Sequence, residues 1–525
     1  MKRAYKTDTK KFIIIKLRVL FDTFENYKFN HIKNLFFTFI LIFILSCSDN
    51  KSETTENLPY EETWESVSKF PKNPDFFRDA KFGIYTHWGP VTVGTDHPDS
   101  RGGVQWYGQN MYNKNNEAYA YHQERFGNQN EIGYKEVTKM FKGEKFDAEE
   151  WADIFFRSGA KFAGPVAIHH DNYAMWDSDV TPWNSADQTP QRDFTGELAT
   201  AIRGKGMLFF TSFHHSYTWG YFINSYQYDG ADPANKDLYC EPHDELAPPS
   251  REFLKTWLAM VNEVVDKYEP DMIWFDFGLG KYIPDEYQIK MIADYYNRAA
   301  KKNKDVAIFH KHEKIQRYTG VLDFERGRTN KQTKYSWLTD TSLGPWFHDP
   351  SHKYYKTDQL IDIFIDIISK NGCMLLNVGP KADGSIPEEA KKILAEIGDW
   401  LKINGEGVFK TRPWKVFGEG PTRMKQSGGF SERARMEYGS KDIRFTKSKD
   451  GKTVYAFILG WPEEKELIIS SLSAKNGTDI SNIKNIKLLG ADENINFSGS
   501  EQGLKIIIPD KKPCDHAFCF KLEMK

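Results

Sequence analysis

Between residues 81 and 404, short apolar runs alternate with longer segments of helical periodicity, and this alternation constrains the fold more than any other feature. Short, continuous apolar runs are typical of buried parallel strands, and the intervening helices supply the crossovers. The pattern predicts strands at 81–87, 161–168, 206–213, 271–276, 305–310, 320–325 and 373–378. Seven strands in this order predict an α/β fold, a (β/α)8-like barrel with an irregular or incomplete strand set.

Three helices between these strands have clear sequence signals. The segment 147–159 begins with Asp147 as a helix cap and has acidic residues in its first turn. The segment 250–268 carries apolar residues at helical spacing, and 387–404 ends at a glycine, Gly405. These helices support the prediction of alternating strands and helices.

After residue 414 the pattern changes to short segments rich in β-branched residues, separated by turn residues and without a long helix. Examples are "TVYAFILGW", "KELIISSL", "LKIIIPD" and "AFCFKLEM". This pattern predicts a C-terminal β-sandwich. The expected domains are a catalytic barrel over 66–414 and a β-sandwich over 415–525.

The N-terminal region predicts an export signal. Residues 35–46, "LFFTFILIFILS", form an apolar run of the length of a signal-peptide core and end at Cys47. The order Ile-Leu-Ser-Cys resembles a bacterial lipobox, so 1–47 is expected to be a signal peptide with Cys47 as the lipidated residue and 48–65 a polar tether. The prediction is an exported, lipid-anchored cell-envelope protein, periplasmic or at the cell surface. The long stretch before the apolar run leaves open an over-early start or a membrane anchor over 10–46.

Charge and cysteine content exclude two classes of function. The 525-residue chain has 71 Lys and Arg against 73 Asp and Glu, and this balance makes nucleic acid an unsuitable partner. No CxxC pair occurs, which argues against a structural zinc site. Aromatic residues make up 15% of the chain, and they suit either a large core or a cleft that stacks on sugar rings.

Polar residues that could take part in catalysis or binding follow several predicted strands. In a (β/α) barrel the carboxyl ends of the strands meet at one face, where catalytic residues collect. The residues expected there are His87, His169, His170, His214, His215, Asp276, His310 and Glu325. No HExxH motif is present, so we expect no metal site and favour recognition of hydroxyl groups by histidines and by aromatics such as Trp106.

Two carboxylates among these residues predict glycoside chemistry. Asp276 and Glu325 end strands that one other strand separates, so both can face the same cleft. A pair of carboxyl groups about 5–5.5 Å apart hydrolyses a glycoside with retention, through a covalent glycosyl-enzyme. The alternative for Glu325 is a loop ion pair with Arg326 or Arg328.

Five motifs together resemble those of the α-L-fucosidases of glycoside hydrolase family 29, in the same order. They are "KFGIYTHWG" (81–89), "QWY" (105–107), "AIHHDNYAMWDS" (167–178), "DMIWFDFG" (271–278) and the 371–414 segment that contains "NVGP". The resemblance implies a barrel with a C-terminal β-sandwich, retaining hydrolysis of terminal α-L-fucosyl residues of glycans, and no cofactor. It makes Asp276 the nucleophile. It also implies a sugar pocket lined by His87, Trp106, His169, His170 and Trp274.

The acid/base residue departs from the family pattern. Many members carry it in a "WE" dipeptide, but Leu338 follows Trp337 here, and leucine cannot donate a proton. We predict Glu325 as the acid/base, with Asp340 and Asp323 as weaker candidates. The segment "FFTSFHHSYTW" brings His214 and His215 near the expected sugar contacts, and His215 is predicted to be one of them. Alternatives are activity on α-L-galactosides or sulfated fucans, and an inactive surface glycan-binding lipoprotein.

Overall fold

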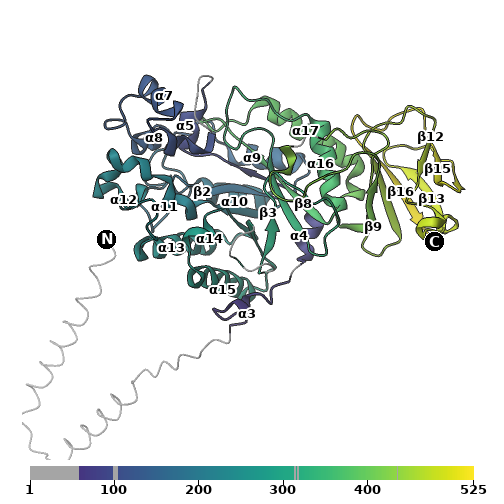
Figure 1. Ribbon diagram of the computed structural model, residues 1–525, viewed down its shortest axis with the longest axis horizontal. Coiled ribbons are helices and arrows are strands. Elements are labelled where there is room, and N and C mark those ends of the chain that lie inside the picture. Colours follow the sequence, from purple (N-terminus) through teal and green to yellow (C-terminus); the bar gives the residue numbers. More distant parts are fainter. Residues whose placement is uncertain (1–57, 72, 98–103, 312–314, 316–318, 434–435) are drawn as a thin grey trace, which may run out of the picture. The chain divides into compact units, whose positions relative to one another are not determined.

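The computed structural model describes residues 58–71, 73–97, 104–311, 315, 319–433 and 436–525. Over these residues, eight parallel strands close into a barrel in sequence order (Figure 1). They are β1 (Phe82–Thr86), β2 (Phe162–Ile168), β3 (Leu208–Phe213), β4 (Met272–Phe275), β5 (Ala307–Lys311), β6 (Val321–Asp323), β7 (Trp337–Ser342) and β8 (Gly372–Val378). Pairing of β1 with β8 closes the barrel. The prediction of a (β/α)8 barrel is confirmed.

One strand, β7, is absent from the sequence prediction. Its sequence "WLTDTS" has only two apolar residues, although all six are buried. The polar side chains find partners inside the fold: Thr339 donates to the Gly327 carbonyl at 2.8 Å, and Tyr85 donates to Asp340 at 3.1 Å. A hydrophobic pattern cannot reveal a strand whose burial depends on such distant partners.

Helices connect and surround the strands. The long ones are α9 (Ala148–Arg157), α10 (Phe194–Gly204), α13 (Arg251–Tyr268), α15 (Asp285–Lys301), α16 (Thr357–Ser369) and α17 (Glu388–Asn404). Shorter ones are α3 (Trp64–Val67), α4 (Asp75–Ala80), α5 (Val91–Thr95), α6 (Tyr107–Asn110), α7 (Glu117–Arg125), α8 (Tyr134–Met140), α11 (Thr218–Tyr221), α12 (Lys236–Tyr239) and α14 (Leu279–Tyr282). Asp147 caps α9 by accepting from the Glu149 and Glu150 amides, as its sequence predicts.

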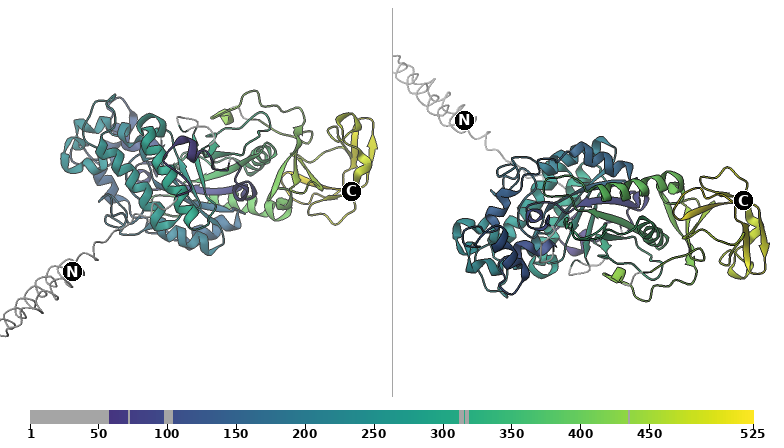
Figure 2. Two further views of the ribbon diagram at one scale, coloured as in Figure 1. Left: turned by 90° about the horizontal axis from the view of Figure 1, so that it is seen from below. Right: turned by 90° about the horizontal axis from the view of Figure 1, so that it is seen from above.

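The C-terminal part forms two antiparallel sheets, the yellow-green to yellow strands of Figure 2, which confirms the predicted sandwich. One sheet has the order β13 (Ile483–Leu488), β16 (Phe518–Met524), β11 (Thr453–Ile458), β10 (Ile443–Ser448) and β9 (Thr411–Glu419). The other has the order β12 (Glu466–Ile469), β15 (Gly503–Ile507) and β14 (Phe497–Ser500). Because β9 begins at Thr411, this sheet includes residues on both sides of the expected boundary at 414.

Side-chain alternation along β11 joins the sandwich to the barrel. Tyr455 and Phe457 belong to the hydrophobic core formed by the barrel and its surrounding helices, whereas Val454, Ala456 and Ile458 belong to a second core between the two sheets. Successive strand residues point to opposite faces, so one strand contributes to both cores. The C-terminal sheet is therefore packed against the catalytic part of the chain.

Two further observations concern the cysteines and the N-terminus. The four cysteines in the described part of the chain, at positions 240, 373, 514 and 519, are free thiols. Within the described ranges, none of the helices has the length and apolar character needed to cross a bilayer. The predicted signal peptide, Cys47 and most of the tether lie outside those ranges.

Candidate active site

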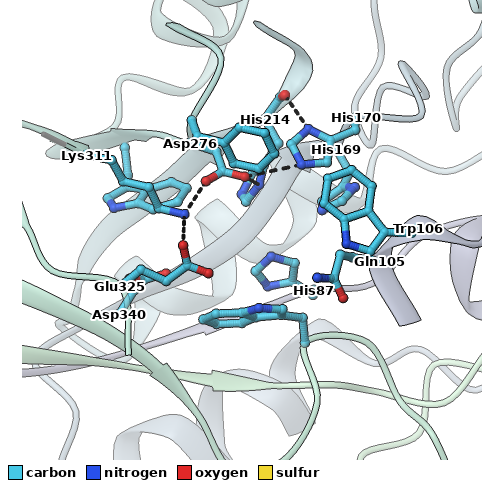
Figure 3. A pocket seen from close by; sticks show the side chains of 13 residues that line it. His87, Gln105, Trp106, His169, His170, His214, Asp276, Lys311, Glu325 and Asp340 are labelled. Carbon is cyan, nitrogen blue, oxygen red and sulfur yellow. Dashed lines mark hydrogen bonds and ion pairs between the residues drawn. The ribbon is translucent and has the colours of Figure 1, made fainter. Parts of the chain in front are cut away.

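A cavity lies where the barrel strands end, and it gathers most of the predicted site residues (Figure 3). Its lining comprises His87, Gln105, Trp106, His169, His170, His214, Trp274, Asp276, Phe277, Lys311, Glu325, Asp340 and Trp346. These residues come from sequence positions more than 200 apart. Parallel strands whose carboxyl ends share one face of the barrel bring them together.

Asp276 follows β4 directly and is 6% exposed. Its Oδ2 accepts a hydrogen bond from His214 Nδ1 at 3.0 Å and lies 3.3 Å from His170 Nε2, while its Oδ1 binds the Lys311 ammonium. Burial opposes the charge, but Lys311 and the two histidines outweigh it and hold the pKa of Asp276 well below its ordinary value. The carboxylate is therefore ionised at neutral pH.

Lys311 joins the two predicted catalytic carboxylates. In the barrel register Phe275 pairs with His310, so Asp276 and Lys311 emerge at the same level of neighbouring strands. The Lys311 ammonium contacts Asp276 and also donates to Glu325 Oε2 at 2.6 Å (Figure 3). Two carboxylate oxygens that accept from one ammonium lie closer together than the roughly 6.5–9.5 Å of an inverting pair, so the arrangement favours retention.

Glu325 lies two residues beyond β6, and its side chain is 16% exposed. Burial raises its pKa to about 7, with further contributions from the charges of Asp340 and Asp276, while the Lys311 ammonium opposes the rise. The two carboxyl groups thus have pKa values on opposite sides of the ordinary range. Such a separation is typical of a pair in which one group stays ionised and the other donates a proton.

The alternative ion pair for Glu325 does not form. Arg326 donates to the Gly344 carbonyl and its guanidinium lies 4.6 Å from the centre of the Trp346 ring, whereas Arg328 pairs with Asp366 at 3.1 Å. Both arginines therefore have other partners, and Glu325 forms its ion pair with Lys311.

His87 is oriented by the asparagine of the "NVGP" motif. Asn377 Oδ1 accepts from the His87 backbone amide and from its ring Nδ1–H, both at 2.9 Å. The Asn377 amide in turn donates to the Trp346 carbonyl at 2.7 Å. Burial lowers the pKa of His87 well below its ordinary value, so the ring is neutral and its Nε2 is an acceptor.

The other predicted sugar contacts lie around Asp276. His169 and His170 follow β2, and Trp106 stacks on the His170 ring with a centroid separation of 5.5 Å. Burial also lowers the pKa of His169 well below its ordinary value. Trp274 is fully buried, and its indole N–H has no hydrogen-bond partner within the described part of the chain. All four residues line the cavity, and their contact with a sugar stays a prediction.

His215 is the exception among the predicted sugar contacts. It does not line the cavity: its ring stacks on Trp257 at 5.9 Å and its Nε2 faces the Trp257 carbonyl at 3.4 Å. Consecutive residues leave β3 in different directions, and it is His214 that turns toward Asp276. The placement of His215 at the sugar pocket is therefore corrected, and of the two histidines it is His214 that lines the cavity.

This difference makes the two neighbouring histidines a matched pair for mutation. We expect His214→Phe to lower kcat about 10- to 100-fold, because it removes a hydrogen bond to the Asp276 carboxylate. His215→Phe is expected to change kcat less than about twofold, since the His215 ring contacts Trp257 and its carbonyl and does not line the cavity. Steady-state kinetics and thermal melting of both variants test this. Equal losses of kcat would contradict the placement.

Asp340, a weaker candidate for the acid/base, also lines the cavity, as do Lys311, Phe277 and Trp346, which are not among the predicted functional residues. Lys311 has a local signal, since it follows "AIFH" at a predicted strand end. Asp340 belongs to the unpredicted strand β7, where its backbone amide donates to Asp323 Oδ1 at 3.0 Å. Trp346 approaches through the loop that Asn377 binds, a contact that sequence spacing does not reveal.

Two clusters of side chains have the proximity of metal ligands. In the described part of the chain, the sets His87–His169–His214 and His170–His214–Asp276 each bring their ligand atoms within 4.8 Å of one another. The Lys311 ammonium already neutralises Asp276 and would repel a second cation there. The expectation of no metal remains a prediction.

Comparison with known proteins places this site in a family. The Alpha-L-fucosidase family model matches residues 47–406, and the model of the Alpha-L-fucosidase C-terminal domain matches residues 437–523. The chain belongs to the α-L-fucosidase family. The predicted resemblance and the assignment as a glycoside hydrolase are thereby confirmed.

Individual relatives support this membership over most of the chain. The Alpha-L-fucosidase of Dictyostelium discoideum is 26% identical and covers 87% of this chain and 93% of its own length. The Tissue alpha-L-fucosidase of Homo sapiens is 27% identical, covering 90% and 93%. The crystal structure of Thermotoga maritima alpha-fucosidase in complex with a mechanism-based inhibitor has a TM-score of 0.71 and 25% identity, covering 88% of this chain and 100% of that one.

Proposed function

We propose that this α-L-fucosidase is a retaining exo-glycosidase that removes terminal α-L-fucosyl residues from glycans, with Asp276 as nucleophile and Glu325 as acid/base. The contact of one ammonium, that of Lys311, with both carboxylates carries the proposal. It holds them closer together than an inverting pair, while burial of Glu325 and the nearby charge of Asp340 raise the Glu325 pKa and leave the two groups in different protonation states.

In the first step, the Asp276 carboxylate attacks the anomeric carbon as the bond to the leaving oxygen breaks. Protonated Glu325 donates its proton to that oxygen, so that a neutral alcohol leaves. Positive charge develops on the sugar ring in the transition state, and the buried Asp276 carboxylate stabilises it. The products are a covalent fucosyl ester on Asp276 and a Glu325 carboxylate.

In the second step, the Glu325 carboxylate removes a proton from water, which attacks the anomeric carbon and displaces Asp276. The Lys311 ammonium favours this change of Glu325 from general acid to general base. Esterification removes the negative charge of Asp276, so the ammonium then interacts with Glu325 alone and lowers its pKa. Glu325 is thereby a stronger acid while Asp276 is esterified and a weaker acid once it is free.

The lining of the cavity suits a small sugar that carries several hydroxyl groups. Neutral His87 and His169 offer acceptors or donors, and the Trp274 indole offers a donor without another partner in the described part of the chain. Trp106 and Trp346 add apolar surface for a sugar face. Hydrolysis of an aryl α-L-fucoside, followed by NMR, tests the proposal: α-L-fucose should form first. Initial release of the β-anomer, or faster hydrolysis of the α-L-galactoside, would contradict it.

The two carboxyl pKa values predict the pH dependence of kcat/KM. Glu325 must be protonated in the free enzyme, so kcat/KM should fall as pH rises through about 7. Asp276 must be ionised, and its low pKa predicts no loss from this group until well below pH 4. A pH profile with a substrate that has a poor leaving group measures both limbs. An alkaline limb that persists unchanged in Glu325→Gln would contradict the assignment.

The protein is also proposed to be exported and anchored to the cell envelope through lipid on Cys47. The apolar run over 35–46, which ends in Ser46 and is followed by Cys47, supports this proposal. Expression with a radiolabelled fatty acid in a bacterium should label the wild-type protein and move it to the membrane fraction. Cys47→Ala should abolish the label. Labelling of the Cys47→Ala protein would contradict lipidation at this residue.

A further inference from the structure

We infer that a segment of the C-terminal part of the chain, residues 427–432, positions the acid/base Glu325 and so takes part in proton transfer. The inference rests on the proposed role of Glu325. It assigns to this segment a function in the reaction in addition to packing.

The first observation is a set of hydrogen bonds between 427–432 and the loop 325–330 that carries Glu325. The Phe430 amide donates to the carbonyl of Glu325 itself at 2.6 Å, and the Glu432 amide donates to the Arg326 carbonyl at 3.0 Å. Further along, the Gly428 amide donates to the Arg328 carbonyl at 3.0 Å. The Ser431 hydroxyl accepts from the Arg328 amide at 3.0 Å, and the Ser427 hydroxyl accepts from the Asn330 amide at 2.8 Å.

The second observation is that strand β7 holds the other side of the same loop. The Arg326 amide donates to the Asp340 carbonyl at 2.8 Å, and Thr339 donates to the Gly327 carbonyl at 2.8 Å. Glu432 joins the two supports, because its Oε2 accepts from the Thr341 hydroxyl of β7 at 3.0 Å. The Glu325 backbone is therefore held between the barrel and the 427–432 segment.

The two segments approach each other closely at Gly327. A Cβ added at Gly327 would lie 2.1 Å from the Gly428 carbonyl oxygen. Arg326, next to Glu325, has a positive φ of 42°, a conformation that a non-glycine residue keeps only when its surroundings impose it. Loss of the 427–432 contacts should let this backbone relax and carry the Glu325 carboxyl away from the leaving oxygen.

The position of residues 427–432 in the chain distinguishes them from the regions that the family models match. The two family models match 47–406 and 437–523, so this segment falls between them. It leads from β9 to β10 of the C-terminal sheet. The barrel thus receives support for its acid/base from a connection that neither family model covers.

The test compares two substrates whose leaving groups differ in how much they need a proton from the enzyme. We expect Ser431→Ala and Gly428→Ala to lower kcat/KM at least about tenfold for an alkyl α-L-fucoside, whose leaving group needs the acid. With 2,4-dinitrophenyl α-L-fucoside, which needs none, the first step should change less than about twofold. Gly428 has a φ of +110° with no atom within 4 Å of an added Cβ, so alanine there disturbs the backbone without a clash.

Gly451→Ala is the matched control. Gly451 also has a positive φ, +75°, and open space around an added Cβ, but it lies in the turn between β10 and β11. This variant should affect both substrates equally or not at all. Glu325→Ala serves as the reference for complete loss of the acid.

The outcomes separate the inference from the proposal beneath it. If Glu325→Ala discriminates between the two substrates while Ser431→Ala and Gly428→Ala do not, the positioning role is wrong and the acid/base assignment stands. Equal losses on both substrates in folded protein would likewise reduce the segment to a structural role. If Glu325→Ala itself fails to discriminate, the acid/base assignment is wrong, and the inference falls with it.

Discussion

Asp276→Ala is expected to lower kcat about 10⁴-fold, equivalent to about 5.5 kcal/mol of transition-state stabilisation, while leaving the fold intact. The variant lacks the nucleophile, so no fucosyl ester can form. Azide, which is small enough to occupy the space left by the carboxylate, should restore activity and yield β-L-fucosyl azide by direct displacement. Kinetics with an aryl fucoside and NMR of the azide product measure both effects.

Asp171→Asn provides the control for this variant. Asp171 lies in the His-His-Asp motif and is also buried, but it does not line the cavity, and its carboxylate accepts from Tyr134 at 2.6 Å. Asparagine can keep that acceptor, so kcat should fall far less than in Asp276→Ala. The role of Asp276 as nucleophile is untenable if Asp276→Ala keeps wild-type kcat. It is equally untenable if a mechanism-based label forms an ester elsewhere.

Glu325→Ala is expected to lose about 10²- to 10⁴-fold in kcat/KM for substrates with poor leaving groups and little for substrates with good ones. The fucosyl ester then forms but hydrolyses slowly, because no base activates water. Azide should accelerate this step and give α-L-fucosyl azide, the opposite anomer from that of Asp276→Ala. Burst kinetics and NMR of the azide product give the two readouts.

Asp340→Asn and Asp323→Asn are the comparison variants, since both residues are weaker candidates for the acid/base. Asp340 lines the cavity and receives a hydrogen bond from Tyr85, whereas Asp323 does not line it. Neither variant should show azide rescue. A fully active Glu325→Ala together with azide rescue in Asp340→Asn would transfer the acid/base role to Asp340.

The sequence predicts those strands and helices whose buried residues form an apolar run or recur at helical spacing. Strands β1 to β6 and β8 are apolar runs, and helices α9, α13 and α17 carry caps or helical spacing, so each element is visible in its own residues. The strand β7 was missed because its buried Thr and Asp side chains depend on partners such as Tyr85 and Glu432. Polar burial of this kind is decided by residues far away in the chain.

The features of the site also divide into those that the sequence predicts and those that it does not. Its two carboxylates were predictable, because a charged residue at the end of a buried strand must emerge where it can be solvated or paired. The direction of the His214–His215 pair was not, since it depends on how the chain leaves β3. The bridging role of Lys311 depends on the register between β4 and β5, which local sequence does not specify.

By itself, then, the sequence determined the barrel, the sandwich and the positions of Asp276 and Glu325 at strand ends, because hydrophobic periodicity and strand order are local properties. Only the tertiary structure decided that one ammonium joins the two carboxylates, that His214 rather than His215 supports Asp276, and that residues 427–432 bind the Glu325 loop. These are contacts between segments that lie apart in the chain. Their formation depends on barrel closure and on the packing of the C-terminal sheet against it.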